Sequence, residues 1–132
     1  MSVAISPFLR QVLIADAAFG AVAAAMFLFG SGVVSSLTDL PQALLFWAGV
    51  ALVPYALLLA LVARGSVTSK LVLIDIVAIN FFWAAASLAL LVGGWIAPNM
   101  LGVAFNLLQA VVVAGFGVLY AITLRQGAQA SA

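Results

Sequence analysis

The sequence predicts an all-α integral membrane protein: a single domain, residues 1–132, with four transmembrane helices in an up-down-up-down antiparallel bundle. Hydrophobic residues make up 68% of the chain and charged residues only 5%, whereas a soluble domain carries roughly 25% charged residues. Four apolar runs are each long enough to cross a hydrocarbon core, which needs roughly 20 helical residues. The polar connections between them are short, so helices that follow one another should be antiparallel neighbours.

The first run covers residues 11–37 and follows Arg10. It is much longer than the 7–15-residue apolar core typical of a signal peptide, and no small-x-small cleavage site follows it. We therefore expect this segment to be retained as a helix. Barrel strands would alternate polar and apolar residues, and none of the four runs does so.

The second run, residues 40–63, begins in "TDLPQ", where Asp39 is the expected N-cap and Pro41 falls in the first turn. Inside this run, Pro54 predicts a modest kink.

The third run, residues 71–92, has Ser69 as a cap and ends at the Gly93-Gly94 pair. The fourth run covers residues 98–124 and begins at Pro98.

All four basic side chains fall on one side of a four-helix topology: Arg10, Arg64, Lys70 and Arg125. By the positive-inside rule this side is cytoplasmic, and both termini lie there. The opposite side carries only Asp39, with Trp47 and Trp95 as interface anchors. The architecture and the composition rich in alanine, valine and leucine indicate a small protein of the bacterial inner membrane.

Two similar stretches, "RQVLIAD" and "SKLVLID", place an aspartate five or six residues beyond a basic residue. They suggest a duplicated helical hairpin, although chance similarity between two apolar segments explains them equally well. Asp16 and Asp75 should each lie about 8–9 Å inside the basic boundary, facing protein rather than lipid. A carboxylate at that depth needs a partner or water.

We therefore predict a polar cluster on the cytoplasmic side, in which basic side chains and tyrosines surround the two aspartates. Its expected members are Asp16, Asp75, Tyr55, Tyr120, Arg10, Arg64, Lys70 and Arg125. The first interpretation is structural, with basic side chains reaching inward to pair with the carboxylates. The alternative is a protonatable aspartate used in transport.

A second polar layer is predicted near the midplane, on the third and fourth helices. Its members are Asn80, Trp83, Ser87, Asn106 and Gln109. Unpaired amides in hydrocarbon cost several kcal/mol, so these side chains should find one another. Three interpretations remain open: interhelical hydrogen bonds, a small amphipathic ligand pocket, and an oligomer contact.

The chain has no cysteine and no histidine, which excludes disulfides, thiol redox chemistry, haem ligation by those residues and ordinary zinc sites. No phosphate-binding loop or metal-ligand spacing is visible, and the net charge of +1 gives no nucleic-acid footprint. We expect no catalytic activity, no cofactor and no metal.

Two functional hypotheses follow. In the first, the protein is a structural or interaction module that partners or regulates another membrane component. In the second, it binds or transports a small apolar or amphipathic ligand between the third and fourth helices. Besides the lipid bilayer, the partners in view are a second copy of the chain, another membrane protein, and a lipid or small apolar ligand.

Overall fold

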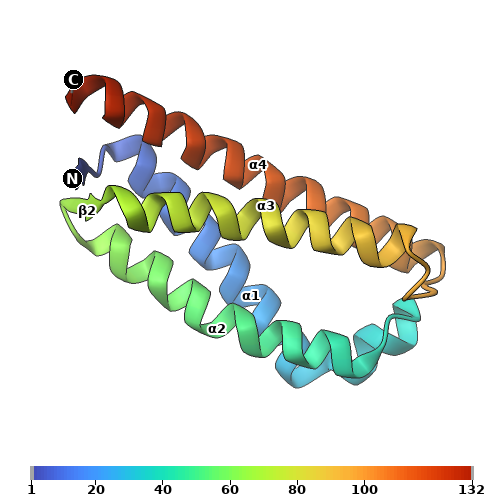
Figure 1. Ribbon diagram of the computed structural model, residues 1–132. Helices are drawn as coiled ribbons and strands as arrows, with labels where there is room; N and C mark the ends of the chain where they lie inside the picture. The colour runs from blue at the N-terminus through green and yellow to red at the C-terminus, as the bar shows by residue number, and fades with distance from the viewer. Residues whose placement is uncertain (1, 132) are drawn as a thin grey trace.

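The computed structural model describes the backbone of residues 2–131 and the side chains of residues 2–126. Four helices dominate it: α1 (Pro7–Thr38), α2 (Gln42–Arg64), α3 (Lys70–Val92) and α4 (Met100–Ser131) (Figure 1). Each contains a segment long and apolar enough to cross a membrane. The predicted multi-pass helical bundle is confirmed.

Helix α1 begins four residues before its predicted start, because Ser6 and Pro7 form a local start signal. The Ser6 side chain accepts a hydrogen bond from the Leu9 N–H at 3.1 Å, and Pro7 occupies the first turn.

The prediction for Asp39 is wrong. This residue terminates α1 in a left-handed conformation, with φ 58°, and its N–H donates to the Ser35 carbonyl at 2.8 Å. Aspartate tolerates this conformation better than most residues. The N-cap position of α2 is held by Pro41, without a side-chain hydrogen bond.

The ends of α3 agree with prediction. The Ser69 side chain accepts from the Leu71 N–H at 3.2 Å, and the helix stops at Gly93, followed by Gly94 at φ 75°. Helix α4 begins two residues later than expected, because Asn99 caps it: its Oδ1 accepts from the Gly102 N–H at 2.8 Å.

A small sheet that the sequence analysis missed lies at the end of the bundle where α1 begins. Strand β1 (Ser2–Ala4) pairs antiparallel with β2 (Val67–Ser69), which lies in the connection between α2 and α3. Arg10 strengthens this junction by donating to the carbonyl oxygens of Ala63 and Gly65. Three-residue strands are too short to show a period-2 pattern in the sequence.

The two hairpins α1–α2 and α3–α4 are each closely packed, and they meet mainly through α1 and α4. Helices α2 and α3 make few close approaches and fan apart from the β2 end (Figure 1). The start of α1, the end of α2, the start of α3 and the end of α4 share one end of the molecule (Figure 1). We call it the basic end, because it carries Arg10, Arg64, Lys70 and Arg125.

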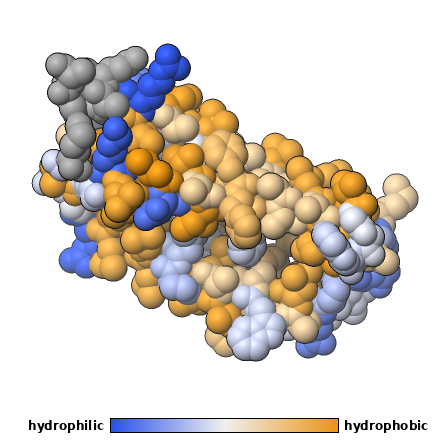
Figure 2. Space-filling model, viewed as in Figure 1, coloured by the Kyte–Doolittle hydropathy of each residue, from blue (hydrophilic) through white to orange (hydrophobic). Residues whose placement is uncertain are grey.

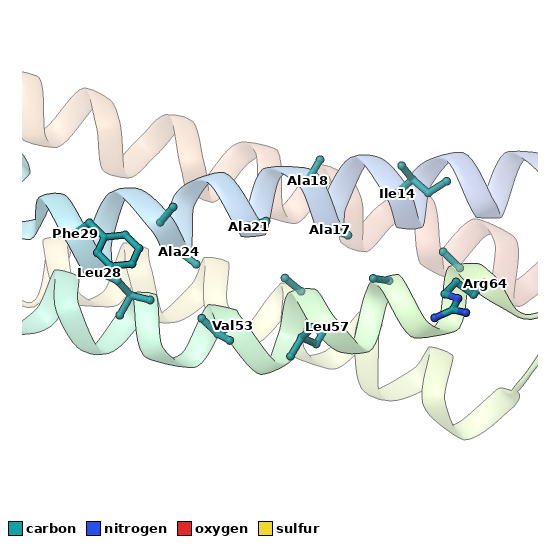
Figure 3. Close-up of a pocket in the computed structure, with 14 residues that line it drawn as sticks. Ile14, Ala17, Ala18, Ala21, Ala24, Leu28, Phe29, Val53, Leu57 and Arg64 are labelled. Atoms are coloured by element: carbon teal, nitrogen blue, oxygen red, sulfur yellow. The ribbon is translucent and has the colours of Figure 1, made fainter.

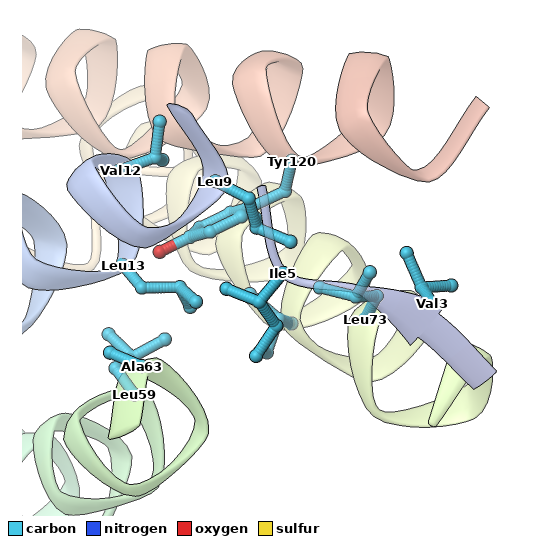
Figure 4. Packing of buried hydrophobic residues seen from close by; sticks show 10 residues of the cluster. Val3, Ile5, Leu9, Val12, Leu13, Leu59, Ala63, Leu73 and Tyr120 are labelled. Carbon is cyan, nitrogen blue, oxygen red and sulfur yellow. The ribbon is translucent and has the colours of Figure 1, made fainter. Parts of the chain in front are cut away.

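Two apolar cores hold the bundle together. At the basic end, Leu13, Leu59, Leu73 and the side chain of Tyr120 are fully buried (Figure 4). At the other end, a smaller core is built around Phe27 and is completed by the residues Leu40, Leu45 and Ile96. The face shown in Figure 2 is predominantly hydrophobic, and large apolar side chains are exposed on all four helices, as expected where lipid is the solvent.

Candidate functional site

Asp16 lies at the centre of a hydrogen-bonded group to which all four helices contribute. Its side chain is only 4% exposed, and its Oδ2 accepts hydrogen bonds from the hydroxyls of Tyr120, at 2.8 Å, and Tyr55, at 3.2 Å. Tyr55 in turn accepts a hydrogen bond from the Asn80 amide at 2.6 Å. We call Asp16, Tyr55, Asn80 and Tyr120 the Asp16 cluster.

The Asp16 cluster links the two helical hairpins. Tyr55 lies on α2 and Asn80 on α3, so their hydrogen bond joins two helices whose backbones make few close approaches. Asn80 also donates to the Ile76 carbonyl of its own helix at 2.8 Å, which fixes the orientation of its amide. Asn80 was predicted to belong to the midplane layer, but it is connected through Tyr55 to Asp16.

The partners of Asp16 are phenols rather than the predicted basic side chains. Arg10 is turned toward backbone carbonyls of the α2–α3 connection. Arg64 and Arg125 are exposed, and Lys70 is partly exposed. Of the eight residues predicted to cluster, the structure therefore brings together only Asp16, Tyr55 and Tyr120.

Asp75 does not face protein as expected; it is exposed. The buried face of α3 consists of Leu73, Ile76, Asn80 and Ala84. At 3.6 residues per turn, Asp75 lies about 100° from Ile76 and about 140° from Asn80 around the helix axis. The two similar stretches of sequence thus place their aspartates in different environments.

Both hydrogen bonds to Asp16 end on the same carboxylate oxygen, Oδ2. Oδ1 receives neither of them. Within the part of the chain that the structure describes, no fully buried side-chain oxygen or nitrogen lacks a hydrogen-bond partner.

The remaining midplane residues form a closed ring of hydrogen bonds between α3 and α4. The Trp83 indole donates to Gln109 Oε1 at 3.0 Å, and Gln109 Nε2 donates to Asn106 Oδ1 at 3.2 Å and to its carbonyl at 3.0 Å. Asn106 donates to the Ser87 carbonyl at 3.0 Å, and the Ser87 hydroxyl donates to the Trp83 carbonyl at 2.7 Å. We call these four residues the amide ring.

A groove is present elsewhere, on the outer seam of α1 and α2, with a volume of about 710 Å³. None of the residues predicted to form a ligand pocket lines it. Its walls are mostly alanine, and Arg64 stands at one end (Figure 3). Alanine-rich stretches in both helices were the available signal, but the sequence analysis did not identify them as a groove.

The polar side chains of the two clusters are engaged in hydrogen bonds with one another and with the backbone. Among residues 2–126, no group of three or more potential metal ligands from His, Cys, Asp and Glu is gathered. The Ser87 hydroxyl is engaged with a backbone carbonyl rather than with a base. Comparisons with protein-family models, curated proteins and solved structures found no match to this chain.

Proposed function

We propose that the protein is a non-catalytic interaction module of the bacterial inner membrane, which acts as a partner or regulator of another membrane component. The observation that carries this proposal is the amide ring. Its side-chain donors end on protein acceptors within the α3–α4 hairpin. A ligand pocket at this position would instead direct amide donors into an open cavity.

Hydrogen bonds of this kind stabilise membrane bundles by holding helices in register, at about 0.6 kcal/mol each on average. The polar residues of the interior are thereby used for folding. The molecule presents to its surroundings a broad apolar surface and a basic end. Both features suit association with other membrane components.

Photo-crosslinking in native membranes tests the interaction proposal. A photoreactive residue is placed in turn at exposed positions on different helices: Trp47, Phe82 and Val111. A partner that docks on one face should give a discrete crosslinked protein from that face only. Replacing a bulky exposed side chain beside the reactive position with alanine should abolish this crosslinked product. Crosslinking to lipid alone from every face contradicts the proposal.

We also propose that the basic end is cytoplasmic, as the positive-inside rule indicates. The chain contains no cysteine, so single cysteines at Ser36 and Ser66, both exposed and at opposite ends, report topology directly. A membrane-impermeant thiol reagent should label Ser36→Cys in intact cells and Ser66→Cys only after permeabilisation. The reverse pattern contradicts this orientation.

A second candidate function, binding or transport of a small ligand, is supported by the Asp16 cluster. An ionisable residue inside a membrane bundle commonly marks a transport or proton pathway, and Asp16 is a buried carboxylate whose Oδ1 receives neither of the two tyrosine hydrogen bonds. If this function is correct, Asp16→Asn should abolish a pH-dependent flux in proteoliposomes, because an amide does not titrate, while the melting temperature falls only slightly. If Asp16 is purely structural, the same change lowers stability and the unmodified protein shows no such flux.

A further inference from the structure

The groove between α1 and α2 runs along both helices toward the basic end. At the end far from the basic end, Phe29 and Val53 line it; α1 departs from helical geometry at Gly30, and α2 contains Pro54. The two helices touch near this end: a Cβ added at Gly49 would lie 2.9 Å from the Phe27 Cβ. At the other end the lining residues include Arg64 (Figure 3).

The groove is shorter than the hydrocarbon core of a bilayer. Its lining residues extend along α2 from Val53 to Arg64, about 16 Å of helix, and along α1 from Ile14 to Phe29, about 22 Å. A hydrocarbon core is about 30 Å thick. A transmembrane helix of another protein would need a seam that continues through the whole core, whereas one acyl chain needs only part of it.

The charge at the Arg64 end of the groove is positive. Arg64 is exposed and lines the groove. In a helix, the Cα–Cβ bond tilts toward the N-terminus, so the Arg64 side chain starts back over the groove rather than away from it. Arg10 does not line the groove; it is bonded to the carbonyls of Ala63 and Gly65.

The walls suit a flexible hydrocarbon chain. Eight of the fourteen lining residues are alanine, and their small side chains leave the groove between the two helices. The polar residues of the bundle interior lie elsewhere, so Arg64 is the one charged group among the lining residues. A ligand that fits is therefore apolar along most of its length and anionic at one end.

We propose that the α1–α2 groove binds an anionic phospholipid, with one acyl chain along the alanine walls and the headgroup phosphate paired with Arg64. This goes beyond the proposed interaction function and does not depend on it. The site belongs to lipid of the leaflet at the basic end.

Native mass spectrometry of the full-length, delipidated protein tests this proposal. The protein is titrated with equal amounts of phosphatidylglycerol and phosphatidylcholine of matched chain length. One positive charge near anionic headgroups should favour the first bound phosphatidylglycerol about fivefold. Arg64→Gln should remove this preference, and Arg125→Gln, another exposed arginine at the basic end, should retain it.

A steric pair tests the position of the acyl chain. Ala21→Phe fills the groove, whereas Ala85→Phe places the same ring at an exposed position on α3. Ala21→Phe should lower the fraction of protein that retains a phospholipid, and Ala85→Phe should not. Equal binding of the two lipids by the wild type, an unchanged preference in Arg64→Gln, or unchanged retention in Ala21→Phe overturns the proposal. So does a groove variant that alters only the ratio of monomer to dimer.

Discussion

Removing the carboxyl group of Asp16 should destabilise the bundle more than any other change to one of its charged side chains. Asp16→Ala leaves the hydroxyls of Tyr55 and Tyr120 without their acceptor inside the protein. A buried polar group that loses its partner costs about 1–3 kcal/mol, while hydrogen bonds between membrane helices average only about 0.6 kcal/mol. Two hydroxyls lose their acceptor, so the limits are about 1 and 6 kcal/mol, and between them we expect Asp16→Ala to cost about 2–4 kcal/mol.

The conservative variant separates hydrogen bonding from charge. In Asp16→Asn, an amide oxygen of the same size can still accept from both phenols, so the cost should be about 1 kcal/mol. At roughly 3 °C per kcal/mol for a chain of this length, the melting temperature should fall by about 6–12 °C in Asp16→Ala and about 3 °C in Asp16→Asn. Unfolding in a mild detergent can be followed by intrinsic tryptophan fluorescence.

Asp75 provides the matched control, since it is exposed rather than buried. Asp75→Ala should change stability by no more than about 0.5 kcal/mol. A double-mutant cycle of Asp16→Ala with Tyr120→Phe should show a coupling of at least about 0.5 kcal/mol, as expected for side chains in direct contact. If Asp16→Ala and Asp75→Ala have the same melting temperature, the Asp16 cluster does not stabilise the bundle as described.

Three further changes test other parts of the structure. Gln109→Ala opens the amide ring and should cost about 1 kcal/mol in the same melting assay, with no effect if the ring is an incidental contact. Gly102→Ala should destabilise strongly, because an added Cβ would overlap the Thr38 carbonyl oxygen. Gly115→Ala is the control: its Cβ would meet nothing within 4 Å, and the change should be neutral or stabilising by up to about 1 kcal/mol. Equal effects of the two changes would contradict the close approach of Gly102 to Thr38. Arg10→Gln should speed amide hydrogen exchange in β1 and β2 without altering exchange at the midplane. Equal protection of β1 and β2 in the wild type and the variant would show that Arg10 does not stabilise this strand pair.

Particular residues show how much of the fold can be predicted from the sequence. The serine at Ser69 and the glycine at Gly93 correctly marked the ends of α3, because capping depends on neighbours within one turn. The prediction for Asp39 was wrong because it also rested on near neighbours alone. An aspartate shortly before Pro41 is typical of a helix start, yet here it ends the preceding helix. The strand pairing of β1 with β2 joins segments more than sixty residues apart, and no local pattern reveals it.

The site was only partly predictable. The sequence showed that Asp16, Tyr55 and Tyr120 should reach one layer, and the structure brings them together. The sequence did not show that Asn80 belongs with these residues, or that Asp75 faces outward. A rotation of one helix by about 100° exchanges neighbouring residues between its inner and outer faces, and an almost uniformly apolar helix carries little information about that rotation.

By itself, the sequence determined that the chain crosses a membrane four times as antiparallel helices. So few charged residues cannot cover a water-exposed surface, and a backbone in lipid must satisfy its own hydrogen bonds. Tertiary structure decided which polar side chains meet, where α1 and α2 leave a groove, and where α2 and α3 separate. These features depend on how helices pack against one another through small residues and side-chain hydrogen bonds, and these contacts exist only once the helices have assembled.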